Sequence, residues 1–74
     1  MKAANKAPNR RQTEVLVMIA GGDRVKNIAD KLNRSEAAIR ERIHLMYAKI
    51  GARNAPHAVA IAMARGWIKP EDLQ

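Results

Sequence analysis

The chain has 74 residues, no cysteine, and 14 Lys and Arg against 7 Asp and Glu, for a net charge of +7. A chain of this length forms one small domain and buries only about 60% of its unfolded surface. Without cysteine and with only two histidines, it lacks the disulfides or zinc ligands that stabilise many small domains, so no metal or cofactor is expected. No apolar run approaches the roughly 20 residues that span a bilayer, and no signal peptide is visible. We therefore expect a cytoplasmic protein that does not contact a membrane.

The excess positive charge is concentrated in two stretches. Residues 1–11 carry four basic residues and no acid, and residues 34–53 carry five basic residues against two acids. This distribution suits a polyanionic partner. The alternative is a solvated surface whose charge only keeps the protein in solution.

Residues 1–8 are expected to form a flexible basic arm, and the first helix follows them. Asn9 is a good N-cap, and Gln12 completes a capping-box pair with it. An apolar stripe then runs from Val15 to Ile19, and Gly21-Gly22 end the helix.

Asp23 is expected to cap a second, short helix, with Val25, Ile28, Ala29 and Leu32 facing inward. Asn33 and Arg34 form a tight turn, and Ser35 caps a third helix over about 36–50. Its inward stripe is Ile39, Ile43, Met46 and Ile50, and Gly51 ends it.

Asn54 caps a fourth helix, which runs to about Arg65 before Gly66. Trp67 and Ile68 are expected to fold back onto the core, and residues 69–74 to be a frayed tail. The prediction is an all-α domain of four helices over residues 9–68.

Two helices joined by a tight turn, the second with its own N-cap, are typical of a helix-turn-helix, whose second helix enters the major groove of DNA. The outward face of the third helix carries residue types that can read bases, since arginine binds guanine and glutamate accepts from cytosine. The two alanines near its start permit close approach to phosphates. The alternative is an ordinary solvated helix face. The predicted DNA-contacting residues are Arg34, Ser35, Ala37, Ala38, Arg40, Glu41, Arg42, His44, Lys49 and Arg53, with Tyr47 also on the outward face.

From Asn9 to Ile68 the chain resembles the LuxR-type (GerE-type) helix-turn-helix domain. The resemblance is carried, in order, by Glu14-Val15-Leu16, Gly22, Ile28-Ala29 with Leu32, Ser35-Glu36 with Ile39-Arg40, Lys49-Ile50-Gly51, Arg53-Asn54 and Ala58-Val59. It implies a transcription factor that binds DNA as a dimer, of bacterial or phage origin. Family members often carry an input module before this domain, whereas only about eight residues precede the first helix here. We therefore expect control through abundance, a partner, or a longer natural chain.

The chain departs from the family pattern at the start of the third helix. Ala37-Ala38 stand where the family usually has Lys-Thr, Arg42 replaces a common His, and Arg34 replaces an apolar residue. Glu41 adds a negative charge on the face expected in the groove. Binding to DNA is expected, but not to a typical family operator.

The fourth helix has two apolar faces. Ala55, Ala58, Ala62 and Gly66 cluster with Val59 on the core side, and a second set lies roughly opposite. A helix with two apolar faces favours a second partner, and the resemblance places the dimer contact here. The alternative is a merely Ala-rich helix. The predicted dimerisation residues are His57, Ala60, Ile61 and Ala64.

These features bear on three classes of function. The first is a sequence-specific regulator, a homodimer on double-stranded DNA and associated with the nucleoid. The second is an adaptor or antagonist that uses the same fold to bind RNA polymerase or another regulator, which the alanines and Glu41 would mark. The third, an enzyme, is not expected, because His57 has no carboxylate or nucleophile at a helical spacing.

Overall fold

The computed structural model describes residues 6–73, and the described part of the chain contains helices and no strands. The helices are α1 (Arg10–Ala20), α2 (Val25–Leu32), α3 (Glu36–Ile50) and α4 (Ala55–Ala64), followed by a 3-10 helix, η1 (Pro70–Leu73). The expected all-α fold of four helices is confirmed. None of these helices has the length and apolar character that crossing a bilayer requires.

Side chains cap three of the four α-helices as the sequence predicts. Asn9 Oδ1 accepts from the Gln12 N–H at 2.8 Å, and Gln12 Oε1 accepts from the Asn9 N–H at 2.9 Å, which completes the capping box. The Ser35 hydroxyl accepts from the Ala38 N–H at 3.0 Å at the start of α3. Asn54 Oδ1 accepts from the His57 N–H at 2.9 Å at the start of α4. These bonds satisfy N–H groups that have no partner within the helix.

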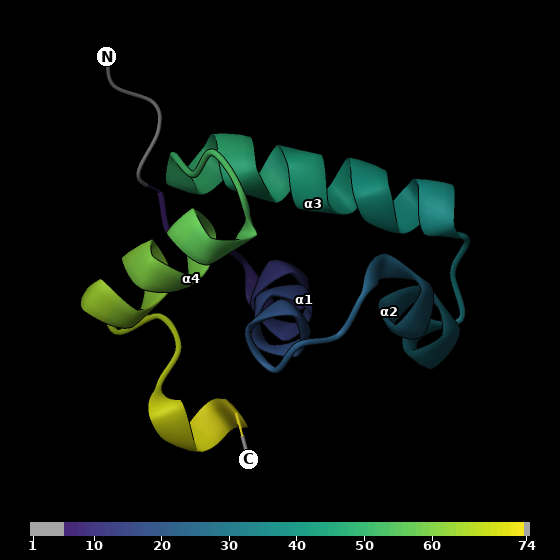
Figure 1. Ribbon diagram of the computed structural model, residues 1–74. Helices are drawn as coiled ribbons and strands as arrows, with labels where there is room; N and C mark the ends of the chain where they lie inside the picture. The colour runs from purple at the N-terminus through teal and green to yellow at the C-terminus, as the bar shows by residue number, and fades with distance from the viewer. Residues whose placement is uncertain (1–5, 74) are drawn as a thin grey trace.

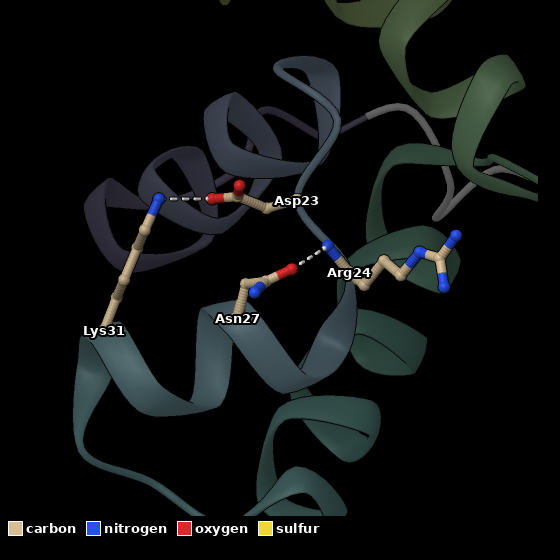
Figure 2. A network of polar contacts seen from close by, with 4 residues as sticks. All are labelled: Asp23, Arg24, Asn27 and Lys31. Carbon is tan, nitrogen blue, oxygen red and sulfur yellow. Dashed lines mark hydrogen bonds and ion pairs between the residues drawn. The ribbon is translucent and has the colours of Figure 1, made fainter.

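The predicted cap of α2 is wrong. Arg24, and not Asp23, occupies the N-cap position, and its backbone N–H donates to Asn27 Oδ1 at 3.2 Å. Asp23 lies one residue outside the cap and pairs with Lys31 Nζ at 2.7 Å (Figure 2). Its carboxylate therefore ties the loop before α2 to the last turn of that helix.

The four helices end with one backbone motif. A residue with positive φ follows each helix, and the next N–H donates to the carbonyl five residues back, as in the Schellman motif. In α2 the positive-φ residue is Asn33 (φ 57°, ψ 48°), a side chain that tolerates this region better than most. The bonds are Asp23 to Met18 at 2.9 Å, Arg34 to Ala29 at 2.9 Å, Ala52 to Tyr47 at 2.8 Å and Trp67 to Ala62 at 2.8 Å.

The longest helix, α3, lies along one side of the molecule, and the other helices pack beneath it (Figure 1). The first helix, α1, passes under the middle of α3, α2 packs below its N-terminal half, and α4 lies by its C-terminal end. This arrangement leaves the opposite side of α3 uncovered by these helices.

The core is entirely aliphatic apart from one methionine. The inward stripe of α3 is confirmed for Ile39, Met46 and Ile50, while Ile43 is half-buried. On α4, Ala58 and Ala62 face the core as expected, but Gly66 is exposed. Ile68 folds back and is buried, with Trp67 half-buried beside it. The buried residues are Val15, Leu16, Ile28, Ala29, Ile39, Met46, Ile50, Ala58, Ala62 and Ile68.

The frayed tail expected over residues 69–74 is a further point of difference. Pro70–Leu73 form η1, which packs against α1, and the Lys69 N–H donates to Asp72 Oδ2 at 2.9 Å. Proline at the first helical position and an aspartate that caps the turn explain why a short polar segment is ordered here. Residue 74 lies outside the described residues, as do residues 1–5 of the expected arm.

Candidate nucleic-acid interface

The turn between α2 and α3 sets how the start of α3 is presented. Residues 33–35 join the two helices, Asn33 in the left-handed region reverses the chain, and Ser35 begins α3. Arg34 and Ser35 are both exposed. The Ser35 hydroxyl accepts the capping bond through its oxygen, so its own hydrogen remains available to donate to a phosphate.

The outward face of α3 is formed as the sequence predicts. Ala37, Ala38, Arg40, Glu41 and His44 are all exposed, on the side away from the buried isoleucines. The first three turns of α3 therefore present two methyl groups, a guanidinium, a carboxylate and an imidazole to one side. Apart from the carboxylate, these groups can bind acceptors or apolar groups on the major-groove edges of bases.

Tyr47 was expected on the same face but is half-buried. Desolvation by this burial raises the pKa of its phenol above the ordinary value of 10.0. The ring packs against the core, and its position near the end of α3 places it on the flank of the outward face.

Arg40 forms an ion pair within α3. Its Nη2 lies 3.3 Å from Glu36 Oε1, one turn earlier, and both side chains remain largely in solvent, 66% and 49% exposed. An exposed pair of this kind contributes at most about 1 kcal/mol. The guanidinium can therefore exchange the carboxylate for guanine at little cost.

The other predicted basic residues divide into two groups. Arg53 lies in the α3–α4 loop and is exposed, like Arg34. Arg42 is half-buried on a different side of α3, where it lines a hollow with Arg11, Glu14, Leu32 and Arg34. Lys49 is also half-buried, and its Nζ donates to Gln12 Oε1 on α1 at 3.3 Å. Arg42 and Lys49 are thus not part of the outward face.

Two cations that the sequence analysis did not select stand at the start of α2. Arg24 and Lys26 are exposed, and the Arg24 side chain extends away from the Asp23–Lys31 pair (Figure 2). In a helix-turn-helix the first helix of the motif crosses the phosphate backbone. The signal that could have found them is the position of basic residues at the first turn of that helix.

A second residue that sequence reasoning missed is Leu45. It lies on α3 and is 56% exposed, the large apolar side chain that the described residues leave in solvent. It lies outside the inward stripe of Ile39, Ile43, Met46 and Ile50, and an apolar residue off that stripe is the signal that could have identified it.

The predicted dimerisation face of α4 is mostly exposed. His57, Ala60 and Ala64 are exposed, and Ile61 is half-buried. The imidazole of His57 is held against its own chain, because its Nδ1 accepts from the Arg53 N–H at 3.1 Å. This bond requires an unprotonated Nδ1 and leaves Nε2 free to bind elsewhere. Beyond His57 the face consists of small or aliphatic side chains.

The described residues hold no cluster of three or more His, Asp or Glu side chains that could bind a metal ion. The outward face of α3 instead carries an arginine and a histidine, side chains of types that can bind base edges.

Comparison with known proteins agrees with this geometry. The family model described as "Bacterial regulatory proteins, luxR family" (GerE) matches residues 9–62, well over half of the chain. The chain belongs to this family. The match covers α1, α2 and α3 in full and most of α4, and the fold is the family's DNA-binding helix-turn-helix. Neither the curated proteins nor the solved structures gave a match.

Proposed function

We propose that this LuxR-family chain is a transcription regulator that binds double-stranded DNA sequence-specifically as a homodimer, in the cytoplasm at the nucleoid. The observation that carries the proposal is the outward face of α3, where Arg40, Glu41 and His44 are exposed and point away from the core. In this arrangement α3 lies in the major groove and its first turns read base edges.

The assignment of contacts follows from which cations are free to reach DNA. Arg40 reads guanine and Glu41 accepts from cytosine N4. Arg34, Ser35 and Arg53 bind phosphates on either side of the groove. The start of α2 adds Arg24 and Lys26, while Arg42 and Lys49, being half-buried, contribute mainly to the positive potential that attracts DNA.

The homodimer is proposed through α4. Its outer residues are His57, Ala60, Ile61 and Ala64, and the two alanines permit close helix approach. The Arg53–His57 bond holds the first turn in one conformation. Two copies related by a two-fold axis would bind a two-fold symmetric operator.

The decisive experiment is selection from a randomised duplex library at about 0.15 M salt, where non-specific binding is already weakened. Enrichment of a two-fold symmetric motif, with half-sites in adjacent major grooves, would support the proposal. Binding without enrichment would show that the protein binds DNA through its charge and without sequence specificity.

A second candidate is an adaptor that binds RNA polymerase or another regulator. It is favoured by the exposed Ala37, Ala38 and Leu45, which give part of α3 an apolar surface. Capture of a defined protein partner by the purified chain, together with failure to shift any duplex, would support the adaptor over the DNA-binding regulator.

A further inference from the structure

The exposure of Leu45 is unusual in this chain. On α3 this residue stands 56% exposed although nearly every other large apolar residue of the described chain is buried or half-buried. Glu41 lies one turn before it and Ala48 one turn after it, both exposed. Ala38 lies two turns before it on the same side. The outward face of α3 thus has two edges, a polar one with Arg40 and His44 and an apolar one with Ala38, Leu45 and Ala48.

The apolar edge has one apolar counterpart in a major groove. Of the groups on the base edges there, only the 5-methyl of thymine is apolar, and the rest are hydrogen-bond donors and acceptors. A polar base edge that Leu45 covers loses its hydrogen bonds to water and gains none from the leucine, which costs free energy. Burial of Leu45 is therefore favourable only where it meets a methyl group. The exposed Arg40 on the polar edge of the same face and the net charge of +7 favour DNA as the occupant.

We propose that Leu45, with Ala38, contacts thymine methyl groups and thereby specifies A·T pairs beside the G·C pair read by Arg40. This inference rests on the proposed function and names the operator chemistry that the face selects. Seven residues separate Ala38 and Leu45, a rise of about 10 Å along α3. At about 3.4 Å per base pair the two contacts fall within about three base pairs of each other.

The test uses the operator recovered from the duplex selection. Each thymine of a half-site is replaced in turn by deoxyuridine, which removes the methyl and keeps the hydrogen-bonding groups. For the wild-type protein we expect the thymines facing Ala38 and Leu45 to be sensitive, and the one facing Leu45 to lose about fourfold in affinity, the effect of one buried methyl group. In Leu45→Ala that position should become insensitive to the replacement, while Leu45→Met, which still fills the contact, should keep the loss.

The matched variants separate a methyl contact from a general defect. Leu45 is exposed and does not pack against the core. Both substitutions should therefore leave the fold intact, which a circular dichroism spectrum checks. An operator with no thymine facing Leu45, or a uracil effect that persists in Leu45→Ala, would overturn the inference while the regulator proposal stands. Failure of the wild-type protein to bind any duplex would instead overturn both proposals. If the wild-type protein captures a protein partner and Leu45→Ala does not, the apolar edge would belong to the adaptor function.

Discussion

Under the proposed function, base reading depends most on the Arg40 guanidinium. It stands on the second turn of α3, exposed, with the Glu36 carboxylate 3.3 Å away. That pair is weak and leaves the guanidinium in solvent, so Arg40 can leave Glu36 for a base at little cost. Glu41 on the same face limits the sequences that can bind, because a carboxylate opposite a base acceptor or phosphate is repelled.

Arg40→Ala tests this assignment. It should weaken binding to the selected operator by about 1–3 kcal/mol and relax the preference at one base pair, because a bidentate contact to guanine is lost. Competition binding with operators substituted at each position measures both effects. Lys69→Ala is the control, since Lys69 is exposed and directly precedes η1, the segment that lies on the far side of the molecule from α3 (Figure 1). Equal losses in the two variants would show that Arg40 contributes only charge.

At the scale of the element, α3 depends on how it begins. Ser35 supplies its cap at 3.0 Å, and Asn33 closes α2 in the left-handed region just before it. These two residues fix the angle between the helices of the motif, and with it the direction in which the outward face points.

Ser35→Ala should lower the free energy of unfolding by about 1 kcal/mol, within a range of 0.5–2, because the Ala38 N–H loses its acceptor. Ser35→Asn keeps a capping oxygen and should retain most of the stability. Urea unfolding followed by circular dichroism at 222 nm compares the two. An Ala variant as stable as the wild type would mean that water satisfies this N–H equally well.

At the scale of the whole molecule, the hydrophobic core is small, and the outer face of α4 is a further apolar surface outside it. Among residues 6–73, a core of ten buried residues, three of them alanines, is small even for this length. Burying the outer face of α4 against a second copy would add apolar contact that the monomer lacks, so folding and dimerisation are expected to be coupled.

Ala60→Glu should shift the protein from dimer to monomer, because a carboxylate is placed at the close approach of two α4 helices. Sedimentation velocity measures the change in mass. Ala48→Glu, an equally exposed alanine on α3, should leave the oligomeric state unchanged. A wild-type monomer at high concentration, or a dimer that survives in Ala60→Glu, would place the dimer contact elsewhere or nowhere.

Charge also acts at this scale. Replacing Lys2 and Lys6 by alanine should weaken binding to all duplexes alike and flatten the slope of log affinity against log salt by up to about 2, since each phosphate neutralised contributes about 0.9. The Lys6 backbone N–H donates to the Lys49 carbonyl at 3.1 Å, which places this end of the arm by the C-terminal end of α3. A change in sequence preference instead would mean that the arm reads bases.

Several features of the fold and the site could be predicted from the sequence because they are local. The Asn9, Ser35 and Asn54 caps, the Asn33 turn and the inward stripe of α3 each depend on residues within two turns of one another. The outward positions of Ala37, Arg40 and His44 follow from that stripe by helical geometry.

Other features depended on neighbours distant in the chain. Asp23 pairs with Lys31 in place of capping α2, and Lys49 turns to Gln12, 37 residues away. Arg42 faces α1, η1 packs on α1, and Leu45 is left uncovered.

The sequence by itself thus determined where α1, α3 and α4 begin and which face of α3 is apolar, since hydrogen bonds and helical periodicity act within a few residues. The tertiary structure alone decided which cations are free, which are half-buried and which apolar side chain remains in solvent. Those outcomes depend on how closely α1, α2 and α4 pack beneath α3, and that packing is set by contacts between segments that no local pattern contains.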